Sequence, residues 1–181
     1  MRIRPAHAID LARLMDLTRQ AFGDSAWSES LMLDILEAAR QRPWLQVVRV
    51  LELGEDFPAD AAANPDPARD PAASSPPAAA VIAGYLVLQV IGADAEIQSL
   101  AVDLRWRRRG LGNTLLEDTL ALAAGRGLER IFLEVRSGNL AAQQFYLRRG
   151  FEIFGRRSRY YHSPVEDALL MRRPVASPAV R

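Results

Sequence analysis

From residue 80 onward, the apolar residues follow an order that leaves few folds open. That order is strand, strand, helix, strand, helix, strand, strand. Parallel neighbouring strands need a crossover of a dozen or more residues, which a helix supplies, whereas antiparallel neighbours need only a short turn. The order therefore predicts a mixed α/β sheet in which a helix crosses between parallel strands. The segments are residues 80–90, 96–102, 110–126, 130–135, 139–149, 151–154 and 167–172.

The residues before this core extend the same α/β pattern. Apolar spacing predicts a short edge strand over residues 1–4, helices over residues 9–21 and 28–40, and a strand over residues 44–53. Ser28 can cap the second helix. Along that helix we expect the core-facing side chains to be Leu31, Ile35 and Leu36.

Residues 54–79 have a different composition from the rest of the chain. They hold six of its 11 prolines, and most of the other residues are Ala, Asp and Ser. Such a stretch cannot bury enough apolar area to offset the backbone entropy of folding, which is about 1–2 kcal/mol per residue. We therefore expect one domain over residues 1–173 with a disordered Pro/Ala-rich insertion at 54–79, followed by a flexible tail over 174–181.

Composition excludes several classes of site. The chain of 181 residues has no cysteine and two histidines that lie far apart, so disulfides, thiolate nucleophiles and His-rich metal sites are excluded, and no metal is expected. All 23 basic residues are arginine, which removes Schiff-base lysines. A net charge of +1 predicts neither nucleic-acid nor membrane binding. The start of the sequence lacks an apolar signal-peptide core, so a cytoplasmic location is expected.

A glycine-containing loop joins the strand over residues 96–102 to the following helix. Gly110 and Gly112 carry no side chain there, so a phosphate can approach the unpaired N–H groups of the helix start. Neighbouring arginines add charge-assisted donors. The loop is therefore a candidate diphosphate cradle. Two alternatives stay open, namely a tight turn with a solvated arginine cluster and a patch for nucleic acid.

A second candidate group consists of Glu134 at the end of a strand and Tyr146 on the next helix. A carboxylate that accepts a proton and a phenol that donates one form a workable acid/base pair, if one cleft receives both. The alternatives are an ion pair between Glu134 and an arginine, and core packing of Tyr146 against Phe145 and Phe151.

Both segments resemble the GNAT superfamily of N-acetyltransferases. Arg107-x-x-Gly110-x-Gly112 fits the R/Q-x-x-G-x-G/A loop of that superfamily. The run Leu-Glu-Val-Arg at 133–136, followed by Asn139, Ala142 and Tyr146, resembles its bacterial ribosomal-protein alanine N-acetyltransferases. Trp-Ser-Glu at 27–29 and Arg-Tyr-Tyr at 159–161 are similar too. The resemblance covers nearly the whole chain except residues 54–79 and the tail.

The resemblance implies a GNAT fold, which is a mixed, mostly antiparallel sheet with a central parallel strand pair flanked by helices. It also implies acetyl-CoA as the acetyl donor, with Glu134 as proton acceptor and Tyr146 as proton donor. The implied cofactor-binding residues are Leu100, Ala101, Val102, Arg107, Arg108, Arg109, Gly110, Leu111, Gly112, Asn113 and Asn139.

The implied reaction transfers acetyl to the N-terminal alanine of a small-subunit ribosomal protein, the one numbered eighteen. Trp27, Tyr160 and Tyr161 could line the peptide groove, although ordinary packing explains them equally well. Without a cysteine, direct attack in a ternary complex is the simplest scheme. Two other functions stay open, namely acetylation of a small-molecule amine or lysine side chain, and a catalytically silent acyl-CoA-binding module.

Overall fold

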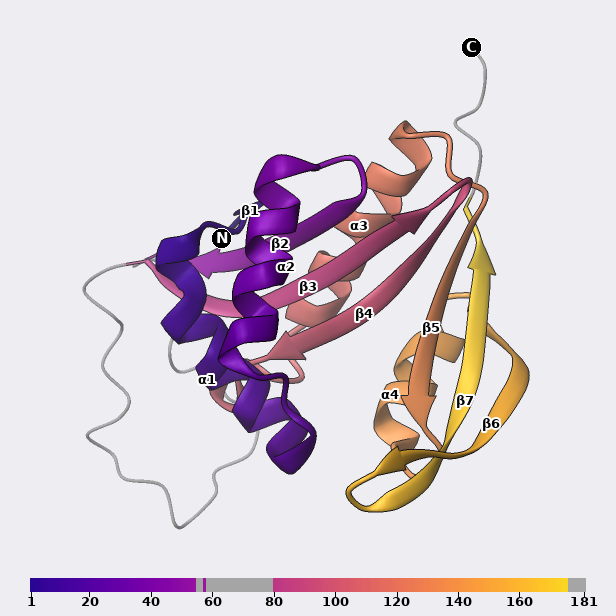
Figure 1. Ribbon diagram of the computed structural model, residues 1–181. Helices are drawn as coiled ribbons and strands as arrows, with labels where there is room; N and C mark the ends of the chain where they lie inside the picture. Colours follow the sequence, from indigo (N-terminus) through magenta and orange to yellow (C-terminus); the bar gives the residue numbers. More distant parts are fainter. Residues whose placement is uncertain (55–56, 58–79, 176–181) are drawn as a thin grey trace.

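The computed structural model describes residues 1–54, 57 and 80–175 (Figure 1). Its helices and strands follow the order expected from the sequence. They are β1 (Arg2–Pro5), α1 (Leu11–Phe22), α2 (Glu29–Gln41), β2 (Gln46–Leu53), β3 (Val81–Ile91), β4 (Asp94–Val102), α3 (Leu111–Gly125), β5 (Arg130–Arg136), α4 (Leu140–Leu147), β6 (Glu152–His162) and β7 (Val165–Pro174). Short 3-10 turns η1 (Ala8–Asp10), η2 (Gly23–Ser25) and η4 (Leu104–Trp106) lie between them.

The seven strands form one sheet in the order β1-β2-β3-β4-β5-β7-β6. The β4–β5 pair is parallel, and α3 makes the crossover between its two strands. The five other strand pairs are antiparallel. This confirms the predicted fold class, a mixed and mostly antiparallel sheet with a central parallel pair flanked by helices.

The sheet opens in its middle, between β4 and β5. These strands pair only where residues 94–97 lie beside residues 130–133, although β4 continues to Val102 and β5 continues to Arg136. β3 holds β4 to its end at Val102, and β7 holds β5 along its full length. The two strands therefore diverge as two halves of the sheet, which Figure 1 shows.

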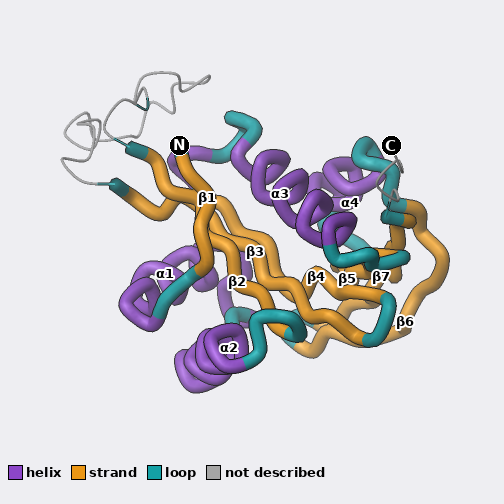
Figure 2. The backbone as a smooth tube through the Cα atoms, turned by 90° about the horizontal axis from the view of Figure 1, so that it is seen from above, coloured by secondary structure: helices purple, strands orange, loops and turns teal. Residues whose placement is uncertain are grey.

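Helices cover both faces of the sheet, α1 and α2 on one and α3 and α4 on the other (Figure 2). Side chains alternate between the two faces along a strand. On β3, Leu86 and Leu88 pack into the core under α3, whereas Tyr85 and Val87 pack under α1 and α2. The Tyr85 hydroxyl is buried and lies 2.7 Å from Thr18 Oγ1 and 3.0 Å from Ser99 Oγ.

Two expectations about the elements, the start of the tail and one core residue of α2, are wrong. Pro174 does not begin a tail, because it is the last residue of β7, and Val175 N–H donates to Glu129 O at 2.8 Å. The strand expected to start at residues 151–154 is present as β6, which runs from Glu152 to His162. On α2, Leu31 is 42% exposed, and Met32 instead is fully buried.

Part of the predicted insertion lies outside the described residues. Of residues 54–79, the structure describes Gly54 and Phe57, so the predicted disorder of that stretch is not addressed, and neither is the tail over residues 176–181. β2 and β3, which flank the stretch, pair as antiparallel neighbours. Within the described ranges, no helix is both long and apolar enough to cross a bilayer.

Candidate active site

The glycine loop leads from β4 through η4 to the start of α3. Arg108 (φ 62°) and Gly110 (φ 82°) both have left-handed backbones, and Gly110 is the N-cap of α3. The first N–H within the helix to find its partner is that of Thr114, which donates to Gly110 O at 3.0 Å. The preceding N–H groups of α3 are therefore available to an anion.

The surroundings of this loop fit a diphosphate. No atom lies within 4 Å of the position that a Cβ on Gly110 would occupy, and Arg107 and Arg108 are exposed beside it. Leu111 is buried and anchors the helix start in the core. A Cβ added to Gly112 would lie 3.6 Å from the ring of Phe145 on α4, which is an ordinary van der Waals contact. Arg109 lies over the Trp106 ring, 4.7 Å from its centroid.

The other predicted cofactor residues surround the opening between β4 and β5. Leu100, Ala101 and Val102 form the part of β4 that has left β5, so the backbone edge facing β5 is not paired with that strand. Asn139 caps α4 by accepting the Ala142 N–H at 3.1 Å. Asn113 Oδ1 accepts from Arg149 Nε at 2.5 Å, which ties the start of α3 to α4.

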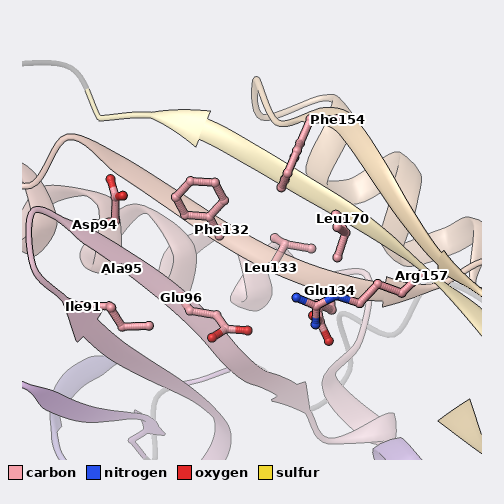
Figure 3. A pocket seen from close by; sticks show the side chains of 10 residues that line it. All are labelled: Ile91, Asp94, Ala95, Glu96, Phe132, Leu133, Glu134, Phe154, Arg157 and Leu170. Carbon is pink, nitrogen blue, oxygen red and sulfur yellow. The ribbon is translucent and has the colours of Figure 1, made fainter. Parts of the chain in front are cut away.

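A pocket of about 350 Å³ lies over the paired stretch of β4 and β5 and ends at Glu134, where the two strands begin to part (Figure 3). The core residues Leu133 and Val135 point toward α3 and α4, so Glu134 between them points to the opposite face. The same alternation on β4 turns Glu96 to that face. Ten residues line the pocket: Ile91, Asp94, Ala95, Glu96, Phe132, Leu133, Glu134, Phe154, Arg157 and Leu170.

Charges inside the pocket are coupled. Arg157 of β6 forms an ion pair with Glu134, whose side chain is 16% exposed. Partial burial and, after it, the charge of Glu134 raise the pKa of Glu96, while Arg157 opposes that rise. A hydrogen bond to Glu134 raises the pKa of Tyr160 above its ordinary value. Burial, followed by the charge of Glu134, raises the pKa of Tyr161 to about 12.

Tyr146 lies on the other face of the sheet. It is 8% exposed, and its ring packs edge-to-face on Phe145 and Phe151 with centroids 5.0 and 5.3 Å away. This burial raises the pKa of Tyr146 well above its ordinary value. Glu134 and Tyr146 lie on opposite faces of the opened sheet, and Tyr146 does not line the pocket that holds Glu134, so their meeting in one cleft stays a prediction. The core packing named as an alternative for Tyr146 is present.

The predicted groove aromatics lie on two segments that meet beside the pocket. Trp27 is partly buried against the α1–α2 core, and Tyr160 and Tyr161 follow one another on β6 with ring centroids 5.2 Å apart. Just before Trp27, Ser25 Oγ donates to Ser163 O in the β6–β7 turn at 2.9 Å. Arg136 Nη2 donates to the same Ser25 oxygen at 2.7 Å.

Comparison with known proteins shows which family the domain resembles. Residues 77–151 match the family model described as "Acetyltransferase (GNAT) family". Over 99% of this chain, the fold matches the crystal structure of the ribosomal-protein-S18-alanine N-acetyltransferase from Escherichia coli, with a TM-score of 0.71, 25% identity and 96% of that chain covered. Residues 77–151 are therefore similar to the GNAT acetyltransferase family.

The curated relatives are about 35% identical to this chain over about half of its length. The [ribosomal protein bS18]-alanine N-acetyltransferase of Salmonella typhimurium is 36% identical over 97 residues, which make up 52% of this chain and 66% of that protein. The "N-alpha-acetyltransferase RimI" of Mycobacterium tuberculosis is 35% identical over 102 residues, 54% of this chain and 63% of that protein. These alignments span slightly less than two thirds of either relative.

Sequence reasoning missed two residues of the pocket, Glu96 and Arg157. Each belongs to a strand other than that of Glu134, and only the sheet register brings them together. One signal was available for Glu96, which is a carboxylate between the apolar residues Ala95 and Ile97 of a predicted strand. Among the described residues, no group of three or more His, Asp or Glu could hold a metal ion.

Proposed function

We propose that this protein is an N-α-acetyltransferase that moves the acetyl group of acetyl-CoA to the N-terminal alanine of a small-subunit ribosomal protein. The observation that carries the proposal is the carboxylate-lined pocket over the paired stretch of β4 and β5, which reaches Glu134 where the two strands separate. The relatives from Salmonella typhimurium and Escherichia coli are named as alanine N-acetyltransferases of ribosomal protein bS18, which supports the choice of substrate.

The glycine loop and the free edge of β4 are the proposed holders of acetyl-CoA. The N–H groups that begin α3, together with Arg107 and Arg108, are donors for the diphosphate. The unpaired backbone of Leu100 and Val102 can hydrogen-bond the amides of the pantetheine arm. When bound, acetyl-CoA supplies a thioester whose C–S bond breaks as the new C–N bond forms.

An N-terminal amine suits a site that offers carboxylates as proton acceptors. The nitrogen must be neutral to attack, and an α-amino group has a pKa of about 8, compared with about 10.4 for lysine. The difference makes deprotonation of an N-terminus about 3 kcal/mol easier. The carboxylates of the pocket, with Glu134 as the member predicted from sequence, can then accept that proton.

Tyr146 is the proposed donor of a proton to the departing thiolate. Because burial raises its pKa, the phenol keeps its proton at neutral pH, as a donor must. Its place on the face opposite Glu134 separates donor from acceptor. The chain contains no cysteine, so acetyl passes directly from thioester to amine with no cysteine-bound acetyl-enzyme.

Acetylation assays with two different peptides test this function. The protein is incubated with acetyl-CoA and either a peptide that begins with alanine or an N-terminally blocked peptide that contains lysine. The expected product is the N-terminally acetylated alanine peptide, detected by mass spectrometry. Acetylation of the lysine peptide alone, or no turnover by protein that binds acetyl-CoA, would refute the proposal and favour one of the two other functions.

A matched pair of variants tests the site. Glu134→Gln should lower turnover most at neutral pH and less near pH 9, where the amine loses its proton unaided. Glu117→Gln makes the same chemical change on the exposed side of α3 and should leave turnover unchanged. Equal rates for both variants at every pH would remove Glu134 from the reaction.

A further inference from the structure

Phe57 is the single aromatic residue within residues 54–79. Its N–H donates to Gly54 O at 3.1 Å, in a turn that directly follows the end of β2. The ring lies partly buried against the core cluster that includes Trp106. Because Pro, Ala, Asp and Ser make up most of residues 54–79, few of their side chains can pack, and the ring of Phe57 is the exception.

The Phe57 ring packs on the segment that leads into the glycine loop. It meets the Trp106 ring of η4 edge-to-face, with centroids 5.7 Å apart. The Arg109 guanidinium lies over both rings, with Cζ 4.7 Å from the centroid of Trp106 and 5.9 Å from that of Phe57. Cation–π attraction acts within about 6 Å of a ring centroid, so both members of this aromatic pair attract Arg109.

Trp106 contributes to the aromatic pair through the face of its ring. The side chain is 8% exposed, and its Nε1 is buried with no hydrogen-bond partner in the part of the chain that the structure describes. An unpaired buried donor lowers stability. What the indole of Trp106 offers its neighbours is therefore packing and a π surface for the guanidinium.

The aromatic pair lies beside a strained part of the glycine loop. Arg108 has a left-handed backbone, which disfavours any residue with a Cβ, and Gly110 is left-handed too. Such a backbone persists only where its surroundings hold it. Arg107 is held on one side, because its Nε donates to Val102 O at 3.1 Å, and Arg109 is held on the other side by the two rings. These two anchors fix the backbone that begins α3 and directs its N–H groups.

We propose that Phe57 is a positioning residue for acetyl-CoA. Together with Trp106 it holds Arg109, and through Arg109 it keeps the glycine loop in the shape that receives the diphosphate. The inference rests on the acetyl-CoA site of the proposed function and extends it to a side chain outside the loop. A loop already held in its binding shape loses less conformational entropy when the ligand binds. Phe57 therefore acts on the affinity for acetyl-CoA and not on the chemical step.

Truncation of Phe57 is the direct test. Phe57→Ala should raise the Kd of acetyl-CoA, measured by calorimetry, about fivefold, which is the scale of a lost cation–π contact. The kcat at saturating acetyl-CoA should stay at its wild-type value, because Phe57 does not line the pocket of Glu134. Phe22→Ala is the matched control, since it removes an exposed ring at the end of α1 and should leave the Kd unchanged. A wild-type Kd in folded Phe57→Ala would overturn the proposal.

Two conservative variants separate the aromatic face from apolar packing. Phe57→Leu keeps an apolar side chain against the core but has no π surface, so it should melt near the wild-type temperature and still bind acetyl-CoA more weakly. Phe57→Tyr keeps the ring and should bind acetyl-CoA like the wild type. If Phe57→Leu also bound like the wild type, packing alone would explain the position, and the proposal would be overturned.

A double-mutant cycle tests the route through Arg109. Arg109→Ala should itself weaken acetyl-CoA binding. In that background, Phe57→Ala should cause no further loss of affinity, because the group that it positions is already absent. Losses that add up in the double variant would show that Phe57 acts on the site by another route, and they would refute the proposed one.

A shorter acetyl donor separates this role from general damage to the fold. S-acetylpantetheine lacks the diphosphate and the adenosine, so its kcat/KM should be the same for the wild type and Phe57→Ala. An equal loss with both donors would count against positioning of the glycine loop. If the folded wild type bound no acetyl-CoA, the proposed function would fail and this inference with it. If the wild type bound acetyl-CoA and Phe57→Ala bound it equally well, only the inference would fail.

Discussion

Asp103 links α1 to the turn that precedes the glycine loop, and its removal tests how that loop is held. Its side chain is 1% exposed and forms ion pairs with Arg13 of α1 and with Arg105 of η4. It also accepts the Arg105 backbone N–H at 2.8 Å, which fixes the turn. Asp103→Asn keeps the shape of the side chain and removes the charge.

The structure sets the size of the expected loss. Burial opposes ionisation of Asp103, but hydrogen bonds from Arg105 and Arg13 outweigh it together and lower the pKa of the carboxyl from 3.8 to about 2. A fall of that size corresponds to about 2.5 kcal/mol of stability. Arg105 is 49% exposed, and solvent screening there reduces the figure to about 2 kcal/mol. The melting temperature should fall by about 4–8 °C.

The sign of the pH dependence follows from the lowered pKa. The stabilisation is fully present above about pH 4, the ordinary pKa of the unfolded chain, and is lost as the pH falls through about 2. Urea denaturation of wild type and Asp103→Asn should therefore differ by about 2 kcal/mol at pH 7, and the difference should shrink steadily below pH 4.

A surface pair gives the matched control for this experiment. Asp16 pairs with Arg19 one turn along α1, with both side chains more than half exposed. Asp16→Asn should change the free energy of unfolding by less than about 0.5 kcal/mol. If Asp103→Asn behaved like Asp16→Asn at pH 7, or if its deficit stayed constant down to pH 2, the reasoning would be refuted.

Three further substitutions test the packing and chemistry of the opened sheet. Gly84→Ala places a Cβ 2.8 Å from Ala101 O and 3.1 Å from Leu115 Cδ1, so urea denaturation should show a loss of about 2 kcal/mol, and wild-type stability would contradict this close packing. A Cβ on Gly110 would meet no neighbouring atom, but the backbone φ of 82° is strained for alanine, so Gly110→Ala should lower the free energy of unfolding by about 1 kcal/mol. A stabilised variant in the same assay would contradict this reasoning. Tyr146→Phe should lower kcat and leave acetyl-CoA affinity by calorimetry unchanged, whereas normal turnover would remove the phenol from the reaction.

The order of the elements could be predicted because each buried element carries its own apolar period. The exposed strand β6 carries none, since almost all its side chains face solvent, and its length is set by pairing with β7. On α2, Leu36 is buried and Ile35 packs against the core as expected, but Met32 rather than Leu31 faces the core. Pro174 fits the end of a strand, where its missing N–H leaves no ladder bond unmade.

In the candidate site too, the residues with a local sequence signal could be predicted and those placed by the sheet register could not. The glycine loop and Glu134 could be found because their signals are local, a few residues long and tied to a strand end. Arg157 could not, since it reaches Glu134 across 23 residues of sequence and the register of β6 with β7 is interrupted near it. A pairing set by a register shift has no periodic trace in the sequence.

The opened sheet accounts for the separation of the two proton-handling groups. β4 and β5 are held apart by their outer partners β3 and β7, so the gap between them connects the two faces. Because side chains alternate along β5, Glu134 points to one face of the sheet, while α4 places Tyr146 on the other face. Under the proposed function, the proton that Glu134 accepts is therefore a different one from the proton that Tyr146 donates. The acceptor and the donor must each exchange with solvent on their own face, so Tyr146→Phe should leave the acidic limb of the kcat/KM profile in place while it lowers kcat.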